Sequence, residues 1–363
     1  MTINGVISCA QCRHLKAYLS PIAFSAPNVD KVAHELVSRF QFNVFARSRW
    51  VSAHTLIIRS PVGNVCHTLI DRSQYQGLFL PGFHQVGSDS QTAGRSQCPI
   101  THFDHITYAC PRSSTAHITR WYHNTFGFQR FFIDRNEDVD EGYVLNHDGI
   151  GLRLTAMEYW KCSESGITLP FKDEKEPDCK FVIAESLPEQ GRNQVDTFLD
   201  QHRGAGIQHI GLYTEDIVRT AQTLSQAGVQ FFSPPPAYYT EVGKQEEIVA
   251  AGHDPHILSQ YGILLDTDIH RDTDNQRYLL QVFTKPIFGE DTFFLELIER
   301  RGATGFGEGN IRALWRSVQA YMENEEHDET ERDAPLAVPL KSVRYRCGSD
   351  RMGSALHLND ELH

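Results

Sequence analysis

Two histidines and one glutamate stand in three short segments that lie far apart in the chain. His105 lies in FDHITYA, His209 in GIQHIGLYT and Glu296 in FFLELIERRGATGFGEGN. Each segment alternates apolar and polar residues like a β-strand, so the three side chains can share one cavity if the strands form one sheet. Two imidazoles and one carboxylate on one face of a metal are the ligand set of non-haem Fe(II) oxygenases. The sequence therefore predicts an enzyme with a metal centre.

The chain contains an internal repeat, and both histidine segments belong to it. Segments 19–48, 103–134 and 207–233 each have the pattern of a strand, a turn, an amphipathic helix and a second strand. The apolar stripes of the three helices consist of Val32, Leu36, Val37 and Phe40, of Ile118, Trp121, Tyr122 and Phe126, and of Ile217, Ala221, Leu224 and Ala227. Where the later copies have a histidine, the first has Pro21, which cannot ligate a metal. We therefore expect a non-catalytic first copy, and the histidines kept in register favour metal ligation over a purely structural role.

Longer motifs add a family resemblance to this pattern. The segments GIQHIGLYTEDI, YLLQVFTKPIFGEDTFFLELIERRG and GFGEGNIRALW resemble the vicinal oxygen chelate superfamily and, within it, the 4-hydroxyphenylpyruvate dioxygenases, over about residues 18–322. The resemblance implies an α+β fold in which βαβββ modules form a half-open barrel around the metal. It also implies that His105, His209 and Glu296 hold an Fe(2+) ion, that is, Fe(II).

The same resemblance predicts the domain organisation. We expect an N-terminal extension (1–17), one non-catalytic βαβββ module (18–86), a linker rich in Ser, Gln and Gly (87–98), a catalytic domain of two modules (99–322) and a disordered tail of mixed charge (323–363). The family has two modules before the linker, so a single module should leave a sheet edge uncovered. Pairing of that edge with a second copy would give a homodimer.

Composition limits the partners of the protein. The chain has 363 residues and a net charge of −12, which argues against a nucleic acid partner. No apolar run approaches the length of a membrane span. Eight cysteines form no regular framework and are expected to stay reduced. The first 28 residues contain no acid, which is compatible with the mitochondrial location that the resemblance implies; the cytoplasm is the alternative.

The resemblance also implies a pocket for a small aryl 2-oxo acid beside the metal. Gln194, Gln208 and Gln281 match pocket glutamines, and an amide can hydrogen-bond a phenol without presenting a charge to it. Phe283 and Phe294 match pocket aromatics that can stack on a substrate ring. For Phe294, ordinary core packing is an equal alternative.

Three pocket positions depart from the catabolic enzymes of the family, which convert 4-hydroxyphenylpyruvate to homogentisate. Ala184 stands for an asparagine, Leu154 for a serine and Ile311 for a phenylalanine, although an insertion in the hairpin after Leu154 makes its alignment less direct. The loss of these groups loosens the hold on the substrate ring. We therefore expect benzylic hydroxylation, in which 4-hydroxyphenylpyruvate and O2 give 4-hydroxymandelate. The resemblance further implies that this product is a precursor of the ubiquinone head group. The retained Phe283 favours the alternative, homogentisate formation.

The glycine-rich segment GFGEGN follows the last predicted strand of the catalytic domain. It lacks the lysine and the βαβ context of a phosphate loop, so we interpret Phe306, Gly307 and Asn310 as part of a hinge for a helix that gates the pocket. Two further alternatives stay open. The chain could act on another aryl 2-oxo acid such as phenylpyruvate, or it could be a catalytically idle binding or assembly module with the same fold.

Overall fold

The structure is a computed structural model that describes residues 3–6, 20–25, 44–49, 54–77, 99–133, 137–147, 150–159, 180–240, 243–268, 277–288, 292–303 and 305–311. All of the described residues belong to one compact unit within Met1–Tyr321. The predicted linker, the hairpin insertion after Leu154, the helix predicted for the first repeat and the predicted disordered tail all lie outside the described residues. The predicted domain boundaries stay predictions.

The N-terminal part forms a five-stranded sheet in the order β1-β2-β5-β4-β3. Its strands are β1 (Ile3–Val6), β2 (Ser20–Ser25), β3 (Val44–Arg49), β4 (His54–Arg59) and β5 (Val65–Asp71). β2 pairs with β5 in parallel and β3, β4 and β5 pair antiparallel, which is the strand arrangement of one βαβββ module. β1 pairs antiparallel with β2 at the sheet edge. β1 lies in the predicted N-terminal extension and covers part of the β2 edge that was expected to be uncovered.

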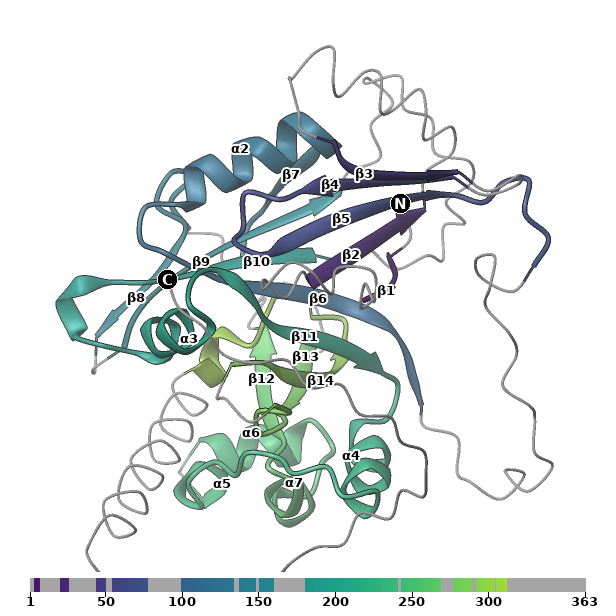
Figure 1. The fold of residues 1–363 in the computed structure, drawn as a ribbon. Coiled ribbons are helices and arrows are strands. Elements are labelled where there is room, and N and C mark those ends of the chain that lie inside the picture. Colours follow the sequence, from purple (N-terminus) through teal and green to yellow (C-terminus); the bar gives the residue numbers. More distant parts are fainter. Residues whose placement is uncertain are drawn as a thin grey trace, which may run out of the picture. The chain divides into compact units, whose positions relative to one another are not determined.

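The part of the chain predicted to be catalytic forms a nine-stranded mixed sheet that curls into a half-barrel (Figure 1). Its strand order is β12-β13-β14-β11-β6-β10-β9-β7, and β8 pairs with β9. The strands are β6 (Ile100–Cys110), β7 (Phe128–Phe131), β8 (Tyr143–His147), β9 (Ile150–Tyr159), β10 (Lys180–Ser186), β11 (Gly206–Thr214), β12 (Leu264–Asp268), β13 (Arg277–Phe283) and β14 (Phe294–Arg301). All three segments with predicted metal ligands are strands of this sheet.

Two βαβββ modules build this sheet and meet at its centre. The β6 module runs from β6 through α2 (Thr115–Phe126) to β10, and the β11 module runs from β11 through α4 (Ile217–Gln226) to β14. In each module the last strand lies parallel to the first, and β6 and β11 pair antiparallel at the junction. The predicted α+β fold with a half-barrel sheet is confirmed.

The helices follow the apolar stripes of the sequence. In α2, Ile118, Tyr122 and Phe126 are buried, whereas in α4 the stripe ends early, because Ala227 is exposed just beyond the last turn. The remaining helices are α3 (Gln194–His202), α5 (Ala237–Thr240), α6 (Lys244–Ala250), α7 (Pro255–Tyr261) and the short 3-10 helices η3 (Pro188–Gln190) and η4 (Glu308–Asn310). Among the described residues, no helix has the length and apolar character needed to cross a bilayer.

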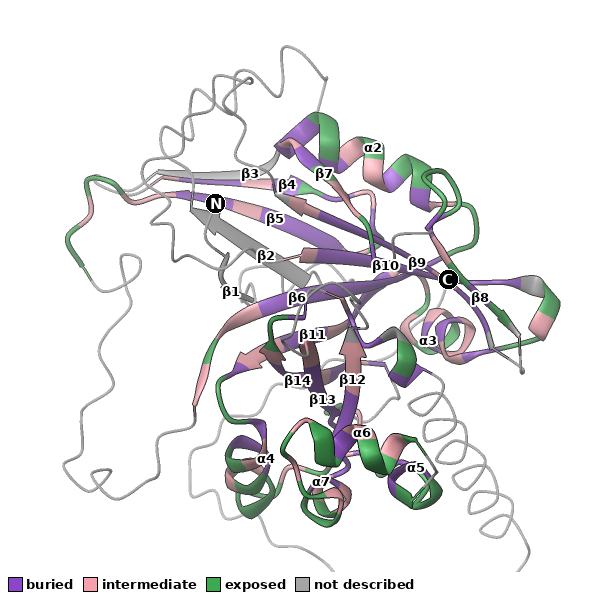
Figure 2. Ribbon diagram, turned by 180° about the vertical axis from the view of Figure 1, so that it is seen from behind, coloured by how far each residue is buried: buried purple, intermediate pink, exposed green. Residues whose placement is uncertain are grey.

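Different layers cover the two modules. Leu56, Ile58 and Leu69 of the N-terminal sheet share one buried cluster with α2 and β6, whereas helices α4 to α7 pack against β12–β14 in a second cluster. Figure 2 shows both groups of buried residues along the curved sheet, with exposed residues on the outer helix faces.

Candidate metal centre

The three predicted ligands stand on three neighbouring strands at the junction of the modules. His105 lies on β6, His209 on β11 and Glu296 on β14, and the sheet order places β11 between the other two. On the middle strand, Gly211 is the register partner of both His105 and Glu296. Because Gly211 has no side chain, the imidazole and the carboxylate can approach each other above β11.

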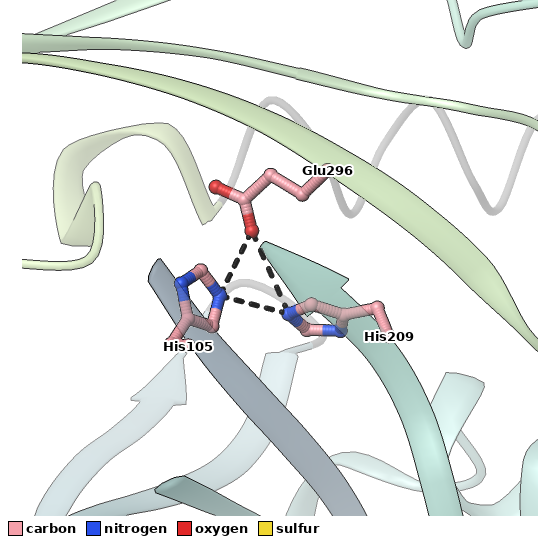
Figure 3. Close-up of side chains that lie close together, drawn as sticks. All are labelled: His105, His209 and Glu296. Atoms are coloured by element: carbon pink, nitrogen blue, oxygen red, sulfur yellow. Dashed lines mark hydrogen bonds and ion pairs between the residues drawn. The ribbon is translucent and has the colours of Figure 1, made fainter. Parts of the chain in front are cut away.

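The three side chains converge on one point (Figure 3). Nε2 of His105 lies 3.0 Å from Oε2 of Glu296 and 3.3 Å from Nε2 of His209, and the distance from His209 Nε2 to Glu296 Oε2 is 3.6 Å. Ligand atoms about 2.1 Å from a metal and at right angles to one another lie about 3 Å apart. The observed triangle therefore fits three ligands on one face of an octahedral ion.

The charges at this point also fit a cation. Glu296 is buried, and its Oε1 atom has no hydrogen-bond partner among the described residues. Burial alone would lower the pKa of His105, but the charge of Glu296 and hydrogen bonds to Asp104 and Glu296 raise this pKa to about 9. Positive charge is thus stabilised beside Glu296, where a proton on His105 and a metal ion would compete for the same position.

His209 has the opposite electrostatic character. Burial, followed by the nearby charge of His105, lowers the pKa of His209 well below its ordinary value. A neutral imidazole is the form that ligates metals. The Oε1 atom of Gln208 lies 3.2 Å from Nδ1 of His209, so this amide oxygen can accept a hydrogen bond from Nδ1–H and leave Nε2 available to a metal. The predicted role of Gln208 in substrate binding stays a prediction.

Sequence reasoning missed two charged residues beside the centre. Asp104 directly precedes His105, and its carboxylate lies 2.9 Å from Nδ1 of His105 and accepts two hydrogen bonds from Arg300. Burial alone would raise the pKa of Asp104, but the hydrogen bonds and charge of Arg300 lower it, so the carboxylate stays ionised. Asp104 begins the buried part of β6, where an aspartate needs a cationic partner, and its place in a predicted strand was the available signal.

The three positions that depart from the catabolic enzymes gather on one side of the centre. Ala184 on β10 is the register partner of Leu154 on β9, and both are buried in one cluster with Val182, Phe306 and Ile311. The ring of Phe306 meets the His105 ring edge-on at 5.2 Å. This cluster therefore forms an apolar wall next to His105.

Aromatic and amide side chains stand on the opposite side. Phe294 stacks on His209 with ring centroids 4.8 Å apart, and Phe283 meets Phe294 edge-on at 6.1 Å. Phe294 also belongs to the core cluster under α4 to α7, which is the packing role considered for it, and its role in substrate binding stays a prediction. Gln281 lies two residues before Phe283 on β13 and is buried. Phe283 and Gln281 therefore share one face of their strand.

Gln194 differs from the other predicted pocket residues. It is the first residue of α3 and is half-buried. Within the described part of the chain, no hydrogen bond or ring contact joins it to the three metal ligands. The predicted role of Gln194 in substrate binding stays a prediction.

The predicted gating segment lies directly against the pocket residues. Asn310 is buried, donates to Oε1 of Gln281 at 3.5 Å and accepts a hydrogen bond from Tyr238 at 2.8 Å. Gly307 has φ +76°, and a Cβ atom there would lie 1.7 Å from Oε1 of Gln281. Glycine is therefore required at this turn. The gated helix itself lies outside the described residues, so the gating role stays a prediction.

Fold and site together define the class of the protein. The family model Glyoxalase/Bleomycin resistance protein/Dioxygenase superfamily matches residues 102–246, which cover the junction of the two catalytic modules. A solved structure of a 4-hydroxymandelate synthase mutant from Streptomyces coelicolor superposes with a TM-score of 0.57 at 22% identity, over 84% of this chain and 77% of that one. This similarity supports the fold.

Relatives of known sequence narrow the family. The chain is 44% identical over 267 residues to the human 4-hydroxyphenylpyruvate dioxygenase-like protein, covering 72% of this chain and 66% of the human one. It is 41% identical over 306 residues to the rat protein of the same description, covering 82% and 76%. A 4-hydroxyphenylpyruvate dioxygenase from Dictyostelium discoideum is 28% identical, over 83% of this chain and 77% of that one. The chain belongs to the family of 4-hydroxyphenylpyruvate dioxygenase-like proteins.

Proposed function

We propose that the protein is an Fe(II)-dependent dioxygenase that converts 4-hydroxyphenylpyruvate and O2 into 4-hydroxymandelate and CO2. The observation that carries this proposal is the triangle of His105, His209 and Glu296, whose spacing and charge fit a divalent ion held on one face. Iron bound there would supply coordination of the 2-oxo acid and activation of O2. The buried site limits access of water to the reaction.

The two sides of the centre support an aryl substrate. Phe283 and Phe294 present aromatic surface beside His209, and each offset or edge-on contact with a substrate ring contributes about 1 kcal/mol. Gln281 offers a neutral amide to a phenolic hydroxyl from the same strand face as Phe283. A phenol such as 4-hydroxyphenylpyruvate uses this amide, whereas phenylpyruvate does not.

The apolar wall bears on the site of hydroxylation. Leu154, Ala184 and Ile311 form this wall without a polar group that could hold the ring in place for attack. A ring that is free to turn away leaves the benzylic carbon nearest to the metal, which supports 4-hydroxymandelate as the product. The aromatic pair Phe283 and Phe294 favours the second candidate, homogentisate formation, because it restrains the ring.

The test is anaerobic loading of the metal-free protein with Fe(II), followed by 4-hydroxyphenylpyruvate and O2 and identification of products by mass spectrometry. We expect 4-hydroxymandelate, and we expect His209→Ala to abolish it. His256→Ala is the matched control, because His256 is an exposed histidine of α7. Homogentisate as the dominant product would establish the second candidate. A protein that binds no iron would instead support the alternative of a catalytically idle binding module.

On the family resemblance alone, we further propose that the product feeds synthesis of the ubiquinone head group in mitochondria. The measurement is incorporation of ring-labelled 4-hydroxyphenylpyruvate into ubiquinone in cells with and without the gene, together with fractionation of the tagged protein. Unchanged labelling without the gene would contradict this role and leave the enzymatic proposal untouched.

A further inference from the structure

Asp104 and Arg300 form an ion pair that crosses the centre of the catalytic sheet. Nε of Arg300 donates to Oδ2 of Asp104 at 2.7 Å and Nη2 donates to Oδ1 at 2.7 Å, so the contact is bidentate. Asp104 lies on β6 and Arg300 on β14, and β11 runs between these strands. The Arg300 side chain therefore spans the middle strand to reach a buried carboxylate.

The same carboxylate fixes the ring of His105. Nδ1 of His105 lies 2.9 Å from Oδ1 of Asp104, the oxygen that also accepts from Arg300. A proton donated from Nδ1 leaves Nε2 as the nitrogen that faces His209 and Glu296. Because Arg300 holds both oxygens of Asp104, it determines where this carboxylate lies and hence how the His105 ring is turned.

Arg300 also holds the segment that carries Phe306. Its Nη1 atom donates to the carbonyl oxygen of Gly305 at 2.5 Å and to that of Ala303 at 3.3 Å. The guanidinium lies 5.8 Å from the centre of the Phe306 ring, and that ring meets His105 edge-on. The contacts thus form a closed circuit from His105 through Asp104, Arg300 and Phe306 back to His105.

The neighbouring Arg301 does not take part in this circuit of contacts. It pairs with Glu299 at 2.6 Å and its side chain is 55% exposed, whereas the side chain of Arg300 is 13% exposed. Successive residues of a strand point to opposite faces, so the two arginines serve different sides of β14. The chain therefore contains its own matched control for Arg300.

We propose that Arg300 is a positioning residue that couples metal binding at His105 to the order of residues 303–311, with Asp104 as the link between them. This inference rests on the proposed metal centre. Coupling of this kind is reciprocal: a metal that holds the His105 ring strengthens the contacts of Phe306, and an ordered segment strengthens the hold on the metal. The segment contains Phe306, Asn310 and Ile311, so metal loading would also order the part of the pocket that these residues form.

The test compares Arg300→Lys with Arg301→Lys in the full chain. Both variants keep the charge, but lysine cannot make the bidentate contact with Asp104. Titration of the metal-free proteins with Fe(II) or Co(II) under anaerobic conditions measures affinity, and hydrogen exchange measures protection of amides 303–311 with and without metal. For Arg300→Lys we expect metal affinity to fall about 10- to 100-fold and the metal-dependent protection to disappear. For Arg301→Lys we expect both to stay as in the unaltered protein.

Asp104→Asn provides the second variant, because it keeps the shape of the side chain and removes the charge that Arg300 pairs with. Its metal affinity should fall together with the protection of residues 303–311. Equal affinity and equal protection in Arg300→Lys, Asp104→Asn and the unaltered protein would overturn the inference while leaving the metal centre intact. Failure of the unaltered protein to bind either metal would instead overturn the proposed function.

Discussion

The two modules of the catalytic sheet share one frame but differ where they face the metal. In the β11 module, Glu296 lies opposite the residue two positions beyond His209. In the β6 module, Val182 lies opposite the residue two positions beyond His105. Each module thus supplies a histidine at the same place, but only one supplies a carboxylate.

Three residues further along, the modules are alike again. Glu185 and Glu299 are both buried, and each accepts hydrogen bonds from the first amides of its module's helix. Glu185 holds Ser114 and Thr115 at the start of α2, and Glu299 holds Ile217 at the start of α4. The carboxylate that secures a helix is present in both copies, whereas the carboxylate that faces the metal is present once.

This difference explains the asymmetry of the site. Val182 is buried in the same cluster as Leu154, Ala184 and Phe306, so the β6 side of the centre is apolar. We expect a metal held by His105, His209 and Glu296 to have its open coordination positions on this side.

The largest effect is expected from replacing each of the two carboxylates of β14 by an amide in turn. Glu296→Gln should abolish metal binding and turnover, because it removes the negative charge that faces both histidines. Glu299→Gln should lower the free energy of unfolding by about 1–3 kcal/mol and keep metal affinity, since it weakens the contact with α4. Metal titration and urea unfolding of both variants check this. Equal metal affinity in the two would break the comparison.

Restoring the symmetry should stop catalysis without removing the metal. Val182→Glu places a second carboxylate where the register predicts a fourth ligand. We expect metal affinity to be kept or raised and turnover to fall about 100-fold or more, because the new ligand blocks a position that substrate or O2 needs. Val182→Leu is the control for added volume. A Val182→Glu protein that turns over as fast as this control would show that the open side lies elsewhere.

The outer layer of the β6 module contains a buried histidine that should make the free energy of unfolding depend on pH. His67 of β5 is fully buried against α2, where its Nε2 lies 2.7 Å from the hydroxyl of Tyr122, and burial lowers the pKa of His67 to about 3. The unfolded chain binds this proton below about pH 6.5, so stability is complete above that pH and falls as pH drops toward 3, by up to about 1.4 kcal/mol per unit.

His67→Gln measures this contribution, because glutamine does not titrate. Between pH 7.5 and 5.5 the unaltered protein should lose about 1 kcal/mol more unfolding free energy than the variant, measured by chemical denaturation at each pH. Identical pH dependence in both proteins would show that His67 is accessible to protons in the folded state.

The smallest effect is expected from restoring restraint to the apolar wall. Ile311→Phe together with Ala184→Asn should shift the product ratio a few-fold toward homogentisate, because both groups limit turning of the substrate ring. Mass spectrometry of the product mixture gives the ratio directly, and Val144→Ala, an exposed position on β8, is the control. An unchanged product ratio would show that the apolar wall does not determine which product forms.

Much of the frame could be predicted because it depends on local periodicity. Alternation in FDHITYA and GIQHIGLYT indicated the strands β6 and β11, and the stripe from Ile118 to Phe126 indicated α2. Predictions that depended on the ends of elements were weaker, as the exposed Ala227 shows. Pairing of β1 with β2 was missed because a four-residue strand carries almost no periodic signal.

The sequence by itself determined which residues could form a metal centre, because a histidine in register in two repeats and a glutamate in a third strand are local facts of type and spacing. Only the tertiary structure decided which of two adjacent arginines serves that centre. Arg300 and Arg301 are equivalent in composition and spacing, and the choice depends on the order β14-β11-β6, which brings one face of β14 over Asp104. Strand order arises from contacts between residues far apart in the chain, so no local pattern contains it.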